Sequence, residues 1–207
     1  MLNNYNIDNF GVVHQTEFAT ISYNPEYIAE RYFKYPEKCV NMSYLRMGYL
    51  IGSIGHIPKS ILDVGYGSGD FLKVCQNIIP KCYGYDITTL PPPDGAKLVT
   101  SIYTNHYEVI SFFDVLEHFE NINDIKNLKC SYLYISLPWC HYHNDEWFEK
   151  WKHRRINEHL HHFNEKSLTN FIESLGYKRI NFSEIEDTIR KDTNCDKNIL
   201  SAVFEKL

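Results

Sequence analysis

The sequence lacks the features that mark membrane-bound and secreted proteins. No apolar run approaches the ~20 residues that a membrane-spanning helix needs, and the first residues carry neither the charged nor the apolar region of a signal peptide. The six cysteines include no C-x-x-C pair, which favours free thiols in a reducing compartment. With a net charge of −5, the chain offers no overall attraction for a polyanion. We therefore expect a cytoplasmic protein that contacts no membrane, and the charge disfavours a nucleic-acid partner.

The sequence does contain enough apolar residues for one substantial core. Hydrophobic residues make up 43% of the 207 residues and aromatic residues 15%, led by 16 tyrosines and 12 phenylalanines. This composition argues against a disordered chain. The length fits one domain with an elaboration.

A glycine-rich turn is the most informative segment. Residues 61–64 (Ile-Leu-Asp-Val) have the apolar pattern of a strand buried on both faces. Gly65, Gly67 and Gly69 follow and permit backbone angles and close approaches that a Cβ would forbid. Apolar residues at helical spacing then occupy residues 71–79. A strand that passes through such a turn into a helix N-terminus predicts a site for a nucleotide-like ligand.

Two acidic residues narrow the choice of ligand. A dinucleotide fingerprint needs the spacing G-x-G-x-x-G, whereas this turn reads G-x-G-x-G, which disfavours an NAD-dependent oxidoreductase. Asp63, which precedes the first glycine, would repel a diphosphate but suits a ligand with an ammonium group. Asp86 ends the next strand-like run about 20 residues after Gly65, where a carboxylate can accept hydrogen bonds from ribose hydroxyls.

This pattern resembles the cofactor-binding half of class I S-adenosylmethionine-dependent methyltransferases. Segments further along resemble the small-molecule branch of that family (methyltransferase 11/23-like), so that the resemblance covers about residues 60–207. It implies that the turn holds the methionine part of S-adenosylmethionine and that the acid after the second strand holds the ribose. The cofactor-binding candidates are Asp63, Gly65, Tyr66, Gly67, Gly69, Asp86, Ile87, Phe113 and Asp114.

From residue 60 onward, strand-like and helix-like segments alternate, which predicts a parallel α/β sheet. With the resemblance, we expect a Rossmann-like doubly wound sheet of about seven strands, mostly parallel with an antiparallel last strand. No helix fits between the second and third strands, because residues 88–95 are rich in proline and form a loop. The strands are predicted at 60–65, 82–87, 97–102, 108–113, 131–137, 178–185 and 199–205, and the helices at 69–79, 121–129 and 165–175.

Residues 1–58 are predicted to form a helical N-terminal extension or cap, and residues 59–207 the cofactor-binding domain. A helix is expected from Asn24, a favourable capping residue before proline, to about Phe33. Residues 42–54 are predicted to form a second helix. The extension either covers one end of the sheet or takes part in substrate binding, and the sequence leaves both open.

The fourth predicted strand runs into a D-x-L-E-H string, from Asp114 to His118. Strand ends beside the glycine turn face the ligand crevice of a doubly wound sheet. The string resembles the corresponding segment of small-molecule methyltransferases, which implies that Asp114 lies near the cofactor. By the same resemblance His118 faces the reaction chamber, as a catalytic base or a substrate contact. The alternative is that Glu117 and His118 only form the polar start of the next helix.

The fifth predicted strand ends in Ser-Leu-Pro-Trp, residues 136–139. Enzymes that methylate amino groups of DNA bases or glutamine typically carry N/D-P-P-Y/F at this place, so the string disfavours that subclass. Trp139 is either an aromatic wall for a ring-shaped substrate or part of the core.

Residues 139–163 are rich in histidine, tryptophan and basic residues and are predicted to form an insert or lid. Three interpretations stay open: a metal site that includes His159 and His162, a basic lid over an anionic substrate, and a structural insert. The substrate-contact candidates are Trp139, His141, His159 and Arg155, and no metal ligand is assigned.

A helix capped by Asn164 and ended by Gly176 follows the insert. The E-H-x-x-x-F-x-x-x-S-L arrangement around its start resembles the C-terminal part of the same methyltransferases. In that family a histidine just before the helix often lies over the active site. His161 and His162 are therefore further candidates for a catalytic base.

These observations together predict a methyltransferase that uses S-adenosylmethionine, releases S-adenosylhomocysteine and acts on a small-molecule or sugar-type acceptor. Methyl transfer from a sulfonium is an in-line displacement, in which the enzyme aligns the nucleophile and excludes water. A hydroxyl nucleophile would also need a base, for which a neutral histidine is suited. Two other functions stay open: a binding module without the chemistry, and a nucleic-acid methyltransferase that contacts phosphates through residues 150–155.

Overall fold

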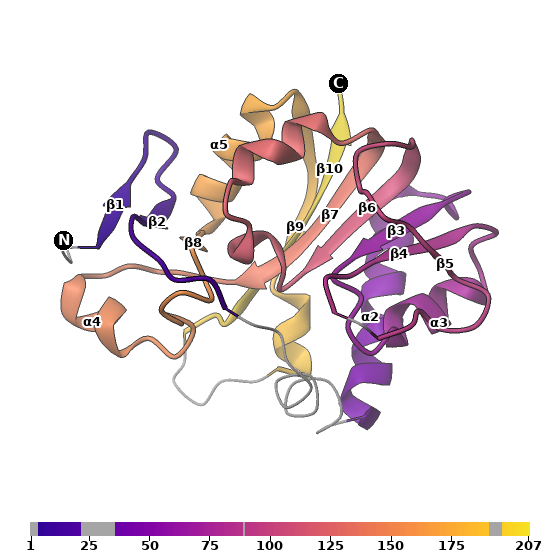
Figure 1. The fold of residues 1–207 in the computed structure, drawn as a ribbon, viewed down its shortest axis with the longest axis horizontal. Helices are drawn as coiled ribbons and strands as arrows, with labels where there is room; N and C mark the ends of the chain where they lie inside the picture. The colour runs from indigo at the N-terminus through magenta and orange to yellow at the C-terminus, as the bar shows by residue number, and fades with distance from the viewer. Residues whose placement is uncertain (1–3, 22–35, 89, 191–195) are drawn as a thin grey trace.

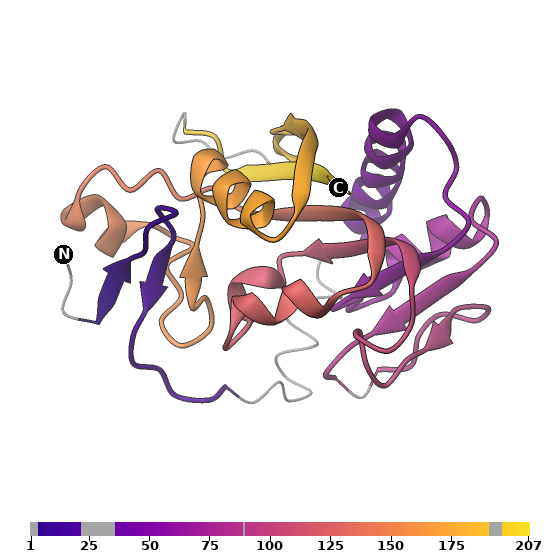
Figure 2. The ribbon, with the colours of Figure 1, turned by 90° about the horizontal axis from the view of Figure 1, so that it is seen from above.

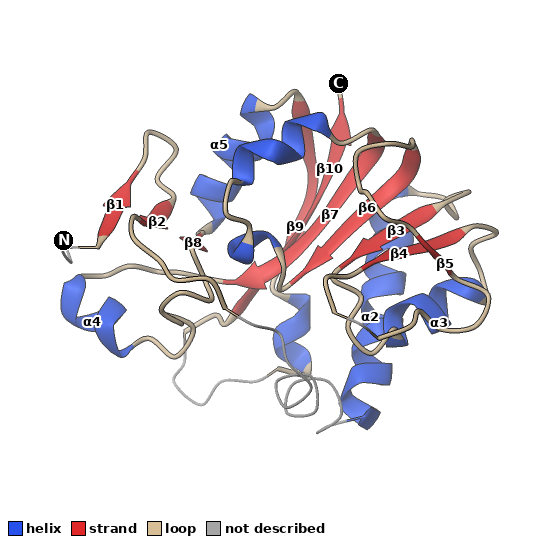
Figure 3. Cartoon of the chain, viewed as in Figure 1, coloured by secondary structure: helices blue, strands red, loops and turns tan. Residues whose placement is uncertain are grey.

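The computed structural model describes residues 4–21, 36–88, 90–190 and 196–207, which form a seven-stranded sheet with helices on both faces and a smaller sheet beside it (Figure 1). The strands of the large sheet are Ile61–Val64 (β3), Cys82–Tyr85 (β4), Lys97–Leu98 (β5), Tyr107–Phe113 (β6), Cys130–Pro138 (β7), Tyr177–Ser183 (β9) and Ile199–Lys206 (β10). They lie in the order β5-β4-β3-β6-β7-β10-β9. Figure 3 shows them as one continuous twisted layer.

The sheet topology confirms the predicted Rossmann-like fold. β3 lies in the interior of the sheet and pairs in parallel with β4 and β6. β6 pairs in parallel with β7, whereas β10 lies antiparallel between β7 and β9. Parallel strands end at the same edge of a sheet, so the turn after β3 lies beside the residues that follow β4 and β6.

Helices cover both faces of the large sheet. One apolar cluster joins the sheet to α2 (Pro36–Ile54) and α3 (Asp70–Gln76). A second cluster joins it to α5 (Glu165–Ser174) and the 3₁₀ turns η1 (Leu116–His118) and η2 (Ile122–Asn127). Within the described ranges, no helix has the length and apolarity that crossing a membrane requires.

The prediction of an α-helix at 121–129 was wrong, because this segment forms the 3₁₀ turn η2. Its buried residues Ile122 and Ile125 are three positions apart, a spacing that suits a 3₁₀ turn. The helices predicted at 69–79 and 165–175 are observed as α3 and α5. In the described residues between β4 and β5 there is no helix, as predicted from the prolines.

The N-terminal extension is not purely helical, which corrects the prediction for residues 5–15. There β1 (Tyr5–Ile7) and β2 (Val13–Gln15) form an antiparallel hairpin, and strands of three residues are too short to show a readable alternation. The helix predicted at 42–54 is observed as part of α2, which begins at Pro36. The helix predicted at 24–33 lies outside the described residues.

The hairpin joins the histidine-rich segment. β2 pairs with β8 (His161–His162), and Figure 2 shows this small sheet beside the large one. α4 (Asp145–Lys150) packs against it. The hairpin of the extension and the segment 139–163 therefore form one unit; the predicted boundary at residue 58 stays a prediction. The core of this unit contains Tyr5, Val13, Cys140 and Phe148.

Candidate active site

The turn after β3 has a backbone that favours glycine. Gly65 and Gly69 adopt φ angles of 71° and 74°, which L side chains rarely adopt. A Cβ on Gly65 would overlap the side chain of Val115, and one on Gly69 would lie 2.7 Å from Pro93 Cδ. The glycines therefore let the turn approach both the segment after β6 and the proline-rich loop.

Asp86 lies against this turn, directly after β4. Its carboxylate accepts hydrogen bonds from the backbone N–H groups of Gly67 at 2.9 Å and Thr88 at 2.8 Å. The neighbouring Ile87 is 64% exposed. The structure thus brings together the two parts of the predicted cofactor site, a glycine turn and an acid on the adjacent strand.

Asp63 and Tyr66 point inward and support the turn. The buried Asp63 carboxylate accepts a hydrogen bond from Ser111 Oγ at 2.7 Å, and burial raises its pKa to about 7. The Tyr66 ring packs so closely on Gly84 that a Cβ there would lie 2.6 Å from Tyr66 Cδ1. The Tyr66 hydroxyl donates to the carbonyl oxygen of Leu90 at 2.5 Å. Both side chains therefore help to position the backbone of the turn and the loop after β4.

Four charged side chains form a cluster beside the end of β6. We call Arg46, Glu186, Arg190 and Asp114 the buried ion cluster, after Glu186, whose side chain is fully buried; the other three side chains are partly exposed. Arg46 Nε and Nη2 donate to the two oxygens of Glu186 at 2.7 and 3.0 Å. Arg190 Nη1 donates to Asp114 Oδ2 at 2.7 Å and to Glu186 Oε2 at 3.2 Å. Burial opposes ionisation of the two acids, but the guanidinium groups outweigh it and hold the pKa values of Asp114 and Glu186 below their usual range.

The buried ion cluster holds the predicted cofactor-site residues at the end of β6. Arg46 places its guanidinium carbon 4.0 Å from the centroid of the Phe113 ring. Asp114 has a φ of 54°, which is uncommon for a residue with a Cβ. No local pattern in the sequence marks Arg46, Glu186 and Arg190, because 140 residues separate the first two.

A second group consists of Glu117, His118 and His159, which we call the Glu-His-His cluster. One potential ligand atom of each residue lies within 4.8 Å of the other two. The rings of His118 and His159 meet edge to face, with centroids 4.7 Å apart. Glu117 is 1% exposed and His159 3%. Both oxygens of Glu117 and the Nδ1 atoms of both histidines lack a hydrogen-bond partner among the described residues.

Burial sets the charge states in the Glu-His-His cluster. It raises the pKa of Glu117 well above its usual range, and the charge of Asp114 adds to this effect. It lowers the pKa values of His118 and His159, so both imidazoles are neutral at pH 7. His118 is a predicted base and His159 a predicted substrate contact, and the structure brings the two together.

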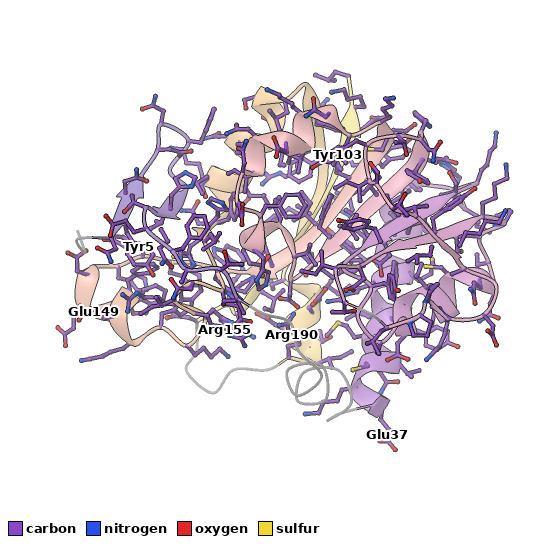
Figure 4. The ribbon with its side chains drawn as sticks, in the orientation of Figure 1. Tyr5, Glu37, Tyr103, Glu149, Arg155 and Arg190 are labelled. Atoms are coloured by element: carbon purple, nitrogen blue, oxygen red, sulfur yellow. The ribbon has the colours of Figure 1, made fainter. Side chains whose placement is uncertain are left out.

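Arg155, a predicted substrate contact, lies near the same cluster. Arg155 and Arg190 lie on the side of the sheet at which β6 and β7 end (Figure 4), and the charges of both act on Glu117. Each already has an acidic partner. Arg155 Nη1 donates to Glu158 Oε1 at 2.9 Å, and Arg190 pairs with Asp114 as described above.

His161 and His162, the other two predicted bases, hold the N-terminal hairpin. His161 Nε2 lies 2.7 Å from the carbonyl oxygen of Phe119, and its Nδ1 lies 2.7 Å from His14 Nδ1. His162 packs edge to face on Phe148, with centroids 5.0 Å apart. Burial lowers the pKa values of His161 and His162 to about 4 and about 3. Because both ring nitrogens of His161 are engaged, its geometry favours a structural role.

Trp139 and His141, the remaining predicted substrate contacts, stack on each other. Their ring centroids are 5.4 Å apart at an angle of 17°. His141 Nε2 lies 2.7 Å from the carbonyl oxygen of Lys197. Trp139 is 9% exposed and, with Asn164 and Arg179, lines a groove of about 400 Å³ beside α5. This position is compatible with both predicted roles of Trp139, as an aromatic wall for a substrate and as a packing residue.

The fold and the glycine turn opposed by an acid define a class I methyltransferase. The chain belongs to the family described as a methyltransferase domain (Methyltransf_23), whose family model matches residues 49–181. The predictions of a methyltransferase and of S-adenosylmethionine, the methyl donor of this class, are thereby confirmed. No curated protein sequence matches the chain.

Solved structures of methyltransferases share the fold at low sequence identity. The 1,6-didemethyltoxoflavin-N1-methyltransferase of Burkholderia thailandensis, solved with 1,6-didemethyltoxoflavin and S-adenosylhomocysteine, has a TM-score of 0.59 at 12% identity, covering 98% of this chain and 99% of its own. The magnesium protoporphyrin IX methyltransferase of Synechocystis PCC 6803, with bound S-adenosylhomocysteine, has a TM-score of 0.57 at 13% identity over 92% and 90% of the two chains. The plantazolicin methyltransferase BpumL, solved with a triazolic analogue and S-adenosylhomocysteine, has a TM-score of 0.54 at 14% identity over 88% and 92%.

Proposed function

We propose that the protein transfers the methyl group of S-adenosylmethionine to a small-molecule acceptor. The observation that carries the proposal is the hydrogen bond between Asp86 and the backbone of Gly67, in a chain whose family is that of methyltransferases. This bond fixes an acid beside the glycine turn, which is the arrangement that a ribose and its neighbouring groups require.

Most of the predicted cofactor residues have a role that their position supports. Asp86 accepts hydrogen bonds from the ribose hydroxyls, and the exposed side chain of Ile87 offers an apolar surface to the adenine. The turn from Gly65 to Gly69 lets the methionine part approach the backbone. Asp63, with a pKa of about 7, supplies negative charge to the ammonium group. Asp114 closes the site next to β6.

The chemistry needs little from the protein beyond alignment and the exclusion of water, because the sulfonium is already activated. When the acceptor is a hydroxyl, a base is needed as well. Of the three predicted bases, His118 is the best placed, since it follows the end of β6 and its Nδ1 has no partner among the described residues. His161 is excluded from this proposal by its two hydrogen bonds.

The acceptor class is inferred from charge and from similar proteins. Two of the similar structures carry names of small aromatic acceptors, a toxoflavin precursor and a magnesium porphyrin. The net charge of −5 disfavours a nucleic acid. The five described cysteines are free thiols, which supports a reducing, cytoplasmic setting.

The test is a transfer assay with methyl-labelled S-adenosylmethionine and separate panels of aromatic metabolites, sugars, RNA and DNA. We expect label in a small molecule together with release of S-adenosylhomocysteine. The Asp86→Ala variant should lose this activity, and the exposed Asp94→Ala variant should keep it. Cofactor binding without turnover on any panel would contradict the proposal in favour of a binding module. Transfer to RNA or DNA alone would contradict the acceptor class.

A further inference from the structure

We propose that Glu117, His118 and His159 bind one divalent transition-metal ion. These residues come from two separate segments, the 3₁₀ turn η1 and the end of the histidine-rich segment just before β8. They converge so that one carboxylate oxygen and two imidazole nitrogens lie within 4.8 Å of one another. Ligands about 2.1 Å from an ion are about 3 to 3.5 Å apart, so small side-chain rotations are enough to close the site.

Four buried polar atoms of the Glu-His-His cluster lack a partner among the described residues. Both oxygens of Glu117 and both Nδ1 atoms are buried without a hydrogen-bond partner in the described part of the chain. A buried polar group without a partner is costly, and a buried carboxylate without one especially so. Protonation would remove the charge of Glu117 but would still leave the two Nδ1 atoms without a partner among the described residues. A cation would satisfy all of these atoms at once.

The nearest protein cations do not fill this role. Arg155 and Arg190 both act on Glu117 through their charges. Arg155, however, donates to Glu158 at 2.9 Å, and Arg190 is paired with Asp114 and Glu186. Asp114 Oδ1, three positions before Glu117, is a further buried oxygen that has no partner among the described residues. The described cations nearest to Glu117 are therefore already paired with other carboxylates.

The backbone holds the two ligand-bearing segments together without the ion. The N–H of Leu160 donates to the carbonyl oxygen of Glu117 at 2.8 Å. One residue further, His161 Nε2 bonds the carbonyl oxygen of Phe119 at 2.7 Å. These two bonds tie residues 160–161 to residues 117–119. Such outer bonds orient metal ligands in known sites.

The donor set selects the class of metal. Imidazole nitrogens suit zinc, iron, nickel and copper, whereas magnesium and calcium prefer oxygen ligands. Two histidines and one carboxylate are also the ligands of zinc sites that keep a position open for water or substrate. If the proposed methyl transfer holds, this open position is where an acceptor oxygen would bind and lose its proton more easily. The ion would then take the place of His118 as the group that assists deprotonation, because the His118 imidazole would be a ligand. That last step rests on the proposed function, whereas metal binding does not.

The test uses the full chain, stripped with EDTA and titrated with Zn²⁺ by calorimetry and with Co²⁺ by visible absorption. We expect one ion per chain and cobalt absorption bands typical of bound imidazole. Glu117→Gln and His159→Gln should each weaken zinc binding about 100-fold or more, beyond the 10–100-fold effect of outer-shell changes. Millimolar Mg²⁺ should not compete.

The matched control is His56→Gln, which removes a histidine that also contacts a carboxylate, Glu108 at 2.6 Å, but on the surface. It should leave zinc affinity unchanged. Binding below one equivalent at high micromolar zinc, or equal affinity in all variants, would overturn the proposal. If a variant fails to fold, X-ray absorption spectroscopy of the zinc-loaded wild-type protein tests the site instead. A spectrum that shows fewer than two imidazole ligands around the zinc would overturn the proposal. Binding of S-adenosylhomocysteine is measured on the metal-free protein. This measurement tests the methyltransferase proposal independently of metal binding.

Discussion

The backbone N–H of Gly67 donates a hydrogen bond to Oδ2 of Asp86 at 2.9 Å. The bond joins the turn after β3 to the end of β4, so the two parts of the cofactor site are already in register without a ligand. Asp86 Oδ1 is held as well, by the N–H of Thr88 at 2.8 Å. The carboxylate therefore has a fixed orientation, and less freedom is lost when a ribose binds.

Replacing Asp86 by alanine should weaken S-adenosylhomocysteine binding by about 10–100-fold. Hydrogen bonds to a charged group contribute about 1.5–3 kcal/mol, and about 1.4 kcal/mol corresponds to a factor of ten. Calorimetry measures the change directly. Asp94→Ala, which removes an exposed acid from the nearby loop, is the control and should bind as the wild type does. Equal affinities for the two variants would remove Asp86 from the site.

Two glycine-to-alanine changes should have opposite effects on stability. Gly65→Ala combines a φ of 71° with overlap on Val115, so the free energy of unfolding should fall by about 2 kcal/mol or more. Gly52 lies in α2 with no atom within 4 Å of an added Cβ. Gly52→Ala should therefore raise the free energy of unfolding by up to about 1 kcal/mol. Urea unfolding measures both, and a loss of stability in Gly52→Ala alone would contradict the account of the turn.

Removing Glu186 from the buried ion cluster should destabilise the protein strongly. Glu186→Ala leaves the Arg46 guanidinium without its two-oxygen partner, and breaking a buried pair in this way costs about 3–5 kcal/mol. The matched surface pair is Lys150 with Glu146, whose side chains are 74% and 77% exposed. Glu146→Ala should change the free energy of unfolding by less than about 1 kcal/mol. Similar losses in the two variants would show that the buried ion cluster contributes little.

The affinity for S-adenosylhomocysteine should rise with pH through neutrality. The pKa of Asp63 is raised to about 7 by burial, so below this pH the group is mostly protonated and must release a proton before it can pair with an ammonium group. Affinity should therefore increase about tenfold between pH 6 and pH 8 and then level off. Calorimetry in buffers of different ionisation enthalpy should detect the released proton. Asp63→Asn should bind independently of pH, and a wild type with the same flat profile would contradict this role.

The central strands and the glycine turn could be predicted from the sequence, whereas the N-terminal hairpin could not. Residues 61–64, three glycines and Asp86 act through local geometry, and all lie where the pattern placed them. The β1–β2 hairpin was missed, because its short strands are defined by their pairing with β8, far along the chain.

The candidate site shows the same limit. His118 was identified from a local string, but its contact with His159 depends on how η1 and β8 meet in the folded chain. Arg46 and Glu186, 140 residues apart, have no local signature at all. Contacts between such distant residues follow from tertiary packing, and periodicity within one sequence does not encode them.

Titration of the wild-type protein with S-adenosylhomocysteine by calorimetry tests the central claim most directly. Asp86 and the turn from Gly65 to Gly69 form one cofactor site. We therefore expect saturable binding of one ligand per chain, and we expect S-adenosylmethionine to compete for the same site. An absence of heat and of competition for both compounds at high micromolar concentration, with a correctly folded protein, would contradict the claim that this chain uses S-adenosylmethionine.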